Sequence, residues 1–378
     1  MRRFVTIMAA LAVMISCKKP YSPPETEISG SILVVEGTIA TGSNTENRFL
    51  LSRVKTLQDT SVNIPESGAS VSIESENGSS WILPENNPGN YSANINLSSS
   101  LKYRLKVLTR NGKQYVTDYL VAAATPPIDS VTWQQPDNLK IFVHTHDPSN
   151  NTHFYRWEFT ETWEYHAYYD SNLDFVNGHI VFRNPGDQTY SCWSSQSSGA
   201  IIIGNTTALT EDVVSYQPVT IVQRPSVKAS YKYSILVRQV GLTQEAFNFW
   251  SILRKNTELT GTLFDPQPSQ MPSNIHCMND PNEQVIGYIS AGVVSEQRIF
   301  IKNADLLNWQ TPGPDSTCKP VSMLANPISA AEAYLNSDTS YGPAYFFPMS
   351  PTFIALAKKP CMDCRRNGGS NIKPPFWQ

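Results

Sequence analysis

The chain has 378 residues, and its 29 Lys and Arg against 32 Asp and Glu give a formal net charge of −3. This slightly acidic balance argues against a nucleic-acid partner, because binding the phosphate backbone requires a surplus of basic side chains. The sequence is rich in Tyr, Thr, Val, Ser, Asn and Pro and poor in Ala, Leu and Lys. That composition favours strands and turns over helices.

The chain opens with the pattern of a secretory signal. Arg2 and Arg3 precede an uncharged, largely apolar run over residues 4–16, and Cys17 follows directly. The run is too short to span a bilayer as a helix, and a small residue before a cysteine is typical of a bacterial lipoprotein signal. We predict that residues 1–16 are removed and that Cys17 is acylated, since each buried methylene adds about 0.8 kcal/mol to membrane binding. The alternative is an ordinary signal peptide with an incidental cysteine.

Residues 17–30 are Pro-rich without periodicity and are predicted to form the lipid anchor and an extended tether. Short segments of strand-forming residues then fill residues 31–125, separated by turn signals such as Asn111-Gly112. About seven short strands with turns about every 8 to 12 residues predict a β-sandwich. The predicted strands are residues 32–39, 49–54, 69–74, 81–83, 91–97, 103–108 and 114–119.

The Pro-containing segment 125–129 interrupts this pattern, so a second, β-rich domain is predicted over residues 126–378. Alternation in the aromatic stretch 154–169 places Tyr155, Trp157 and Phe159 on one face of a strand. Further strands are predicted at residues 139–146 and 231–239.

Two short helices are predicted in the second domain. Thr243 can cap a helix whose apolar stripe is Ala246, Phe249, Trp250 and Leu253. A second helix is predicted over residues 328–335.

Five cysteines follow Cys17: Cys192, Cys277, Cys318, Cys361 and Cys364. An exported protein meets an oxidising compartment, so we expect up to two disulfides and one remaining thiol, with the pairing left open. The C-x-x-C spacing of Cys361 and Cys364 is interpreted as structural, one or both bonding to earlier cysteines. A redox motif would need to begin a helix after a strand, and a zinc site would need further ligands to converge on it.

His144 and His146 form the metal candidate. Two residues apart on a strand, their imidazoles project from one face and could share an ion, with Asp147 and His153 nearby. A zinc site needs three or four convergent ligands, and the sequence does not identify a third. The competing interpretation is a polar strand face that ends at an Asp-Pro turn.

Aromatic and acidic residues of the second domain offer weaker candidates. Exposed aromatic faces bind sugars or peptides, and Trp163, Tyr165 and Tyr168 are predicted to be exposed, whereas the alternating residues before them form core. The carboxylates of Glu158, Glu161 and Glu164 could include an acid/base pair, although solvated faces are commoner. The sequence contains no Gly-x-Ser-x-Gly, phosphate-binding loop or His-Glu-x-x-His motif.

Motifs spread over the mature chain resemble a large family of Bacteroidota lipoproteins called domain of unknown function 4249. The motifs lie at residues 18–24, 33–37, 125–131, 144–148, 155–159, 264–268, 272–275, 285–290, 361–366, 368–369 and 373–377. The resemblance implies an outer-membrane lipoprotein with an immunoglobulin-like N-terminal region and a second β-rich domain. Members look like accessory lipoproteins that accompany TonB-dependent outer-membrane transporters. No catalytic residues are established for the family, so the resemblance assigns none to this chain. Lys18-Lys19 stands where surface-exported relatives often have acidic residues. The resemblance therefore does not indicate whether the body faces outward or inward from the membrane.

The sequence therefore predicts a mainly β protein, an immunoglobulin-like sandwich followed by a larger β-rich domain with one or two short helices. The expected function is a non-catalytic, cofactor-free binding or accessory protein, anchored by lipid to the outer membrane beside a TonB-dependent transporter. The alternatives are a metal-dependent hydrolase built on His144 and His146, and a structural or adhesive surface protein.

Overall fold

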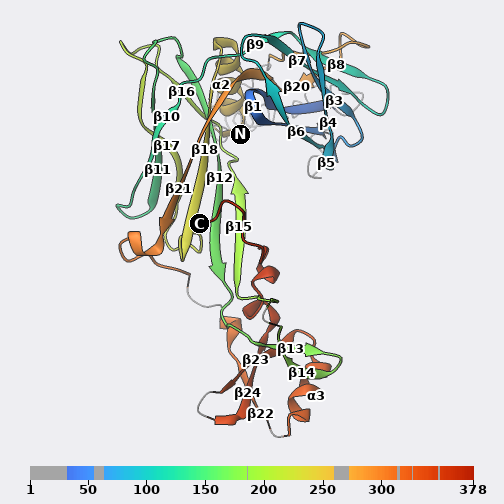
Figure 1. The fold of residues 1–378 in the computed structure, drawn as a ribbon, viewed down its shortest axis with the longest axis vertical. Coiled ribbons are helices and arrows are strands. Elements are labelled where there is room, and N and C mark those ends of the chain that lie inside the picture. The colour runs from blue at the N-terminus through green and yellow to red at the C-terminus, as the bar shows by residue number, and fades with distance from the viewer. Residues whose placement is uncertain are drawn as a thin grey trace, which may run out of the picture.

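The computed structural model describes residues 32–54, 64–184, 186–258, 272–312, 316–325, 327–347 and 350–378. Within them the chain is mainly β, as predicted, with the helices α2 and α3 (Figure 1). The predicted signal peptide, Cys17 and the tether lie outside the described residues. None of the described helices has the length and apolar character needed to cross a membrane.

The N-terminal part folds into two packed sheets, which we call the N-terminal sandwich (Figure 1). One sheet contains β1 (Ile32–Val54), β2 (Ile64–Pro65), β5 (Glu85–Asn87), β6 (Asn90–Leu97) and β20 (Val285–Ile286). The other contains β3 (Ser70–Ser75), β4 (Ser80–Leu83), β7 (Lys102–Leu108), β8 (Gln114–Thr117), β9 (Leu120–Val121) and β19 (Ile275–Cys277). Alternating residues of both sheets, such as Phe49 of β1 and Ile73 of β3, fill the core between them.

Strands from much later in the chain complete the N-terminal sandwich. Antiparallel β19 extends the second sheet beside β8, and β20 pairs in parallel with β1. Ile275, Val285 and Ile289 are buried in the same core as β1 and β3. The chain leaves this sandwich near the predicted boundary at residue 125, but the sandwich itself also needs residues 275–291.

A second sandwich stands beside the first (Figure 1). Its outer sheet is formed by β10 (Ile128–Gln134), β11 (Leu139–His146) and β17 (Val213–Val222). Its inner sheet is formed by β12 (Phe154–His166), β15 (Ser191–Ser197), β16 (Ile202–Asn205), β18 (Lys232–Gly241) and β21 (Ser290–Lys302). Tyr155, Trp157 and Phe159 of β12 are buried between the sheets, as their alternation predicts.

Strand β21 joins the two sandwiches. Its first residues pair in parallel with β1, from Thr38 opposite Ser290 to Thr41 opposite Val293, and the rest pairs antiparallel with β18. One ten-stranded sheet therefore runs through both sandwiches. This continuity fixes how the facing surfaces of β1 and β12 are placed.

The helix prediction is confirmed for both segments. Helix α2 (Gln244–Glu258) begins after Thr243, whose hydroxyl accepts a hydrogen bond from the backbone N–H of Ala246 at 3.2 Å. Helix α3 (Ser329–Ser337) lies in a distal lobe at the far end of the molecule (Figure 1). The other elements of this distal lobe are β13 (Leu173–Val176), β14 (His179–Phe182), β22 (Val321–Leu324), β23 (Tyr341–Phe347) and β24 (Ser350–Lys358).

Two disulfides hold the C-terminal segment, residues 359–378, which includes η3 (Lys359–Cys361) and η4 (Cys364–Asn367). Cys192 of β15 is bonded to Cys364, and Cys318 is bonded to Cys361. The segment ends on the inner sheet, where the Trp377 ring packs edge-on against Trp193 and Phe300. The disulfides thus tie the distal lobe and the chain end to the second sandwich.

Candidate functional site

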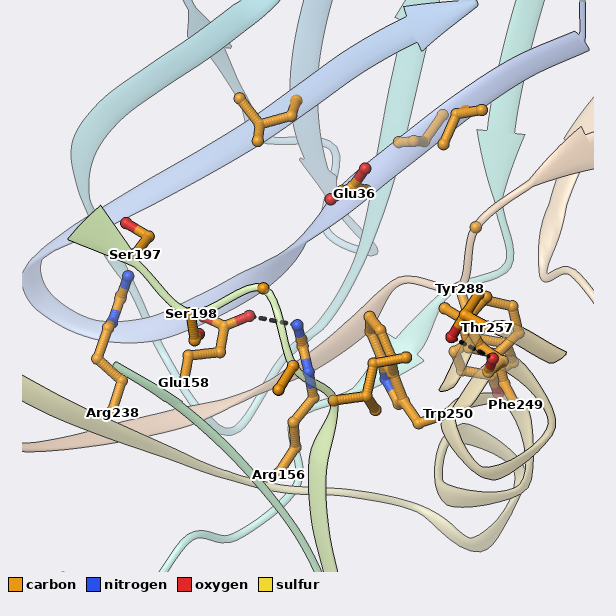
Figure 2. Close-up of a pocket in the computed structure, with 18 of the residues that line it drawn as sticks. Glu36, Arg156, Glu158, Ser197, Ser198, Arg238, Phe249, Trp250, Thr257 and Tyr288 are labelled. Atoms are coloured by element: carbon orange, nitrogen blue, oxygen red, sulfur yellow. Dashed lines mark hydrogen bonds and ion pairs between the residues drawn. The ribbon is translucent and has the colours of Figure 1, made fainter. Parts of the chain in front are cut away.

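A cleft of about 490 Å³ lies between the N-terminal sandwich and the second sandwich (Figure 2). A smaller pocket of about 110 Å³ continues it. The two share Glu36, Arg48, Leu50, Arg156, Glu158, Arg238 and Trp250. We call this combined space the inter-sandwich cleft.

The pleat of the inner sheet gives the cleft one charged wall. Because Tyr155, Trp157 and Phe159 point into the core, Arg156 and Glu158 point the opposite way, toward the cleft. Glu158 lies directly opposite Arg238 of β18, and Arg238 lies opposite Glu296 of β21. Arg238 forms an ion pair of 2.8 Å with Glu296, from Nε to Oε1. The wall therefore carries a row of alternating charges across three strands.

Arg156 is the most enclosed charge of the cleft. Its guanidinium carbon lies 3.7 Å from the centroid of the Trp250 ring, and one of its terminal nitrogens forms an ion pair with Glu158 (Figure 2). Burial lowers the pKa of Arg156, an effect opposed by the carboxylates of Glu158 and Glu36. The shift leaves an arginine cationic at neutral pH, so Arg156 presents its remaining donors as a charged group.

Strand β1 forms the opposite wall. It bends back on itself, and the Asn47 carboxamide exchanges two hydrogen bonds with the backbone of Ala40, at 2.8 and 3.0 Å. Gly37 allows the close approach: it has a φ of +155°, and a Cβ there would lie 2.7 Å from the carbonyl oxygen of Arg48. Glu36 and Arg48, on the two limbs of this bend, are exposed toward the cleft.

Glu36 and Arg48 differ from the charges of the opposite wall. Among the residues that the structure describes, neither has an ion-pair or hydrogen-bond partner for its side chain. In Figure 2, Glu36 stands across the open space from Arg156, Glu158 and Arg238. Among the described residues, the larger pocket thus offers one carboxylate and one guanidinium without a direct partner, and Glu46, which lines only the smaller pocket, is a second exposed carboxylate.

Apolar side chains line the remaining surface. Leu50 of β1 is 44% exposed, and Ile201, Leu253 and Ile286 add partly buried aliphatic groups. Trp250, in contrast, is only 9% exposed, and Arg156 covers its ring. The apolar surface available to a ligand is therefore mostly aliphatic, and Tyr288 is its partly buried aromatic member.

The metal candidate gathers no third ligand among the described residues. His144 and His146 do lie on the outer face of β11, but each has its own partner. Nε2 of His144 lies 2.8 Å from the Thr132 hydroxyl, and Nδ1 of His146 lies 2.8 Å from the carboxylate of Asp129. No cluster of three or more His, Cys, Asp or Glu able to hold a metal ion occurs in the described ranges. The polar strand face that ends at an Asp-Pro turn is the better description.

The three predicted aromatic ligand residues do not converge on the cleft. Tyr168 is exposed as expected, at 53%, beside the Cys318–Cys361 disulfide. Trp163 is partly buried, with the Lys228 ammonium 5.0 Å from its ring centroid. The prediction that Tyr165 is exposed is wrong: it is 7% exposed and donates a hydrogen bond of 2.8 Å to the Cys364 carbonyl. The C-terminal segment covers it, which alternation alone cannot indicate.

The acidic candidates also lie in different surroundings. Glu158 lines the cleft, whereas Glu161 is buried in the second sandwich, where it accepts a hydrogen bond from Tyr233 and pairs with Lys228. Burial, followed by the charge of Glu161, raises the pKa of Tyr233 well above its ordinary value. Glu164 contacts His166 at 2.9 Å instead. The three carboxylates do not form one site.

The five body cysteines form the expected two disulfides and one free thiol. The C-x-x-C cysteines belong to two different bridges, so the spacing is structural rather than a redox motif. Cys277 is a buried free thiol, with its sulfur 3.5 Å from a carboxylate oxygen of Glu283.

The sequence model of a family described as "Domain of unknown function (DUF4249)" matches residues 18–298. The match spans most of both sandwiches and includes every residue that lines the inter-sandwich cleft. Strands β22 to β24, helix α3 and the C-terminal segment lie beyond it, so the resemblance of residues 361–377 stays a prediction. A comparison with curated proteins finds no match.

Proposed function

The chain belongs to the family of domain of unknown function 4249, and on this premise we propose that it is a lipid-anchored binding protein of the outer membrane. Cys17 would carry the lipid, and the body would act beside a TonB-dependent transporter. The inter-sandwich cleft would hold the ligand before it passes to the transporter.

The observation that carries the proposal is the cleft itself. Its volume of about 490 Å³ falls within the range of about 300 to 1,000 Å³ that is typical of small-ligand sites. Two sandwiches supply its walls, and such inter-domain positions are preferred for ligand binding. A lipid on Cys17 would confine the cleft to the membrane plane and so raise its effective concentration near a transporter.

Binding rather than catalysis is favoured by the state of the carboxylates. Glu158 is paired with Arg156, and Glu296 is paired with Arg238. A general acid or base must lie within hydrogen-bond reach of the group that it protonates or deprotonates, and these two carboxylates are instead held against guanidinium groups of the same wall. Their pairing leaves Glu36 and Arg48, on the opposite wall, as the charges of the larger pocket that a ligand can bind directly.

Affinity purification of the tagged lipoprotein from detergent-solubilised membranes tests the proposal. A TonB-dependent barrel should be recovered in a ratio near one to one, and an unrelated lipoprotein with the same tag should not recover it. Metabolic labelling with a clickable palmitate should mark the wild-type chain but not Cys17→Ser. Recovery of the lipoprotein without a transporter, in repeated purifications, would contradict the accessory role.

A further inference from the structure

We propose that the inter-sandwich cleft recognises a zwitterion with an aliphatic body, namely a short peptide with free termini. This inference rests on the proposed binding function and names the ligand class of the same site.

In the larger pocket of the cleft, three of the five charged side chains are already paired, with one another or with Glu296. Arg156 is paired with Glu158, and Arg238 is paired with Glu296. Glu36 and Arg48 lack such partners within the described part of the chain, and both are exposed on β1. Each therefore has its full hydrogen-bonding capacity free for a ligand.

In the larger pocket the two unpaired groups, Glu36 and Arg48, have opposite signs, which limits the charge of a ligand bound there. An anion without a positive group would gain from Arg48 but would be repelled by the nearby Glu36. A cation without a negative group would be attracted by Glu36 but repelled by Arg48 and Arg156. Complementary potentials are a main source of specificity, so a ligand with one ammonium and one carboxylate fits this site.

The geometry of each group suits one terminus. A guanidinium binds a carboxylate through two parallel N–H···O hydrogen bonds, which Arg48 can supply to a peptide C-terminus. An ionised carboxylate accepts hydrogen bonds from the three donors of an ammonium group, a role open to Glu36. Peptide termini carry these two groups and no others.

The uncharged surface indicates the body of the ligand. Leu50, Ile201, Leu253 and Ile286 offer aliphatic contacts for apolar side chains. The aromatic rings of the cleft are already engaged, because Arg156 covers Trp250 and the Tyr288 ring packs against Phe249 with 5.4 Å between centroids. Stacking of a sugar ring is therefore disfavoured. The volume of about 490 Å³ accommodates a small ligand and not a folded protein.

Isothermal titration of the complete mature lipoprotein in detergent, with trileucine as the probe, tests this inference. Free trileucine should bind at least about tenfold more tightly than either its N-acetylated or its C-amidated form. Glu36→Gln should abolish discrimination against the acetylated form only, and Arg48→Gln should abolish discrimination against the amidated form only. Glu211→Gln and Arg110→Gln, at exposed positions outside the cleft lining, should leave both preferences unchanged.

The outcomes separate this inference from the proposed function. Equal affinity for free and capped peptides, or no binding of trileucine by a protein that still recovers its transporter, overturns the peptide inference alone. Charge-dependent binding of trileucine without any transporter overturns the accessory role and leaves the ligand class intact. Circular dichroism of each variant checks that the sandwiches remain folded.

Discussion

The guanidinium of Arg156 on β12 lies 3.7 Å from the ring centroid of Trp250 on α2. This contact fixes the helix against the inner sheet at the edge of the cleft. Enclosed cation–π contacts contribute about 2 kcal/mol or more, and exposed ones about 0.5–1 kcal/mol. The pair therefore supports both the position of α2 and the shape of the binding surface.

Replacing Arg156 with Lys should lower the free energy of unfolding by about 1 kcal/mol, because the ammonium keeps the charge but loses the flat face that stacks on Trp250. Urea denaturation followed by tryptophan fluorescence measures the change. Arg110→Lys, at an exposed position of the N-terminal sandwich, serves as the control and should have no effect. An unchanged midpoint for Arg156→Lys would show that stacking contributes nothing.

The turn after β11 makes stability depend on pH. Burial opposes ionisation of Asp147, but hydrogen bonds from Ser149, Asn151 and Thr152 outweigh it and hold the pKa of Asp147 well below its ordinary value. A lowered folded-state pKa stabilises the fold above the unfolded-state pKa of about 3.9, and this stabilisation is lost as pH falls below that value.

Asp147→Asn should consequently cost about 1 kcal/mol at pH 6, since a neutral amide accepts fewer and weaker hydrogen bonds. The difference between wild type and variant should shrink as pH falls from 4 toward 2. Urea unfolding at several pH values measures it. Asp137→Asn, an exposed residue between β10 and β11, should show no such trend, and a constant difference for Asp147→Asn would refute the linkage.

Strand β12 shows which structural features could be predicted from the sequence and which could not. Alternation correctly placed Tyr155, Trp157 and Phe159 in the core, because a strand's period is a local property. The same alternation turned Arg156 and Glu158 to the other face. What covers that face is decided by β1 and α2, which lie about 100 residues away on either side, so the cleft could not be located from spacing.

The contacts of His144, His146 and Tyr165 could not be predicted, for the same reason. His144 and His146 share a strand face as expected, but their partners Thr132 and Asp129 come from β10, whose register no local pattern specifies. Tyr165 is covered by residues about 200 positions later, which the Cys192–Cys364 disulfide holds in place. The spacing of the cysteines in the sequence does not predict which of them pair. Long-range pairing, rather than element type, was the unpredictable part.

The cysteine arrangement makes a direct chemical prediction. Denaturation without reductant should expose a single reactive thiol in the body, Cys277, because the other four body cysteines are paired. Alkylation followed by peptide mass spectrometry identifies it. Labelling of Cys192 or Cys361 under these conditions would contradict the two bridges.

Removing one bridge should loosen its own region. The Cys318→Ser, Cys361→Ser double variant should lose about 2–4 kcal/mol, the range typical of a native disulfide, and hydrogen exchange should rise in the distal lobe. The N-terminal sandwich contains neither bridge, so its exchange should stay unchanged. Cys277→Ser is the matched control that removes a thiol without removing a bridge.

The last prediction concerns the N-terminal sandwich as a folding unit. A fragment of residues 32–125 lacks β19, β20 and the buried side chains of Ile275, Val285 and Ile289. Loss of a buried aliphatic side chain costs about 2–5 kcal/mol, and a domain's whole stability is about 5–15 kcal/mol. The fragment should therefore show no cooperative unfolding by circular dichroism. The same fragment joined to residues 272–293 through a Gly/Ser linker regains both strands and should unfold cooperatively. Cooperative unfolding of residues 32–125 alone would contradict this prediction. It would mean that the early strands are sufficient for a stable sandwich and that the later segment is not required for folding.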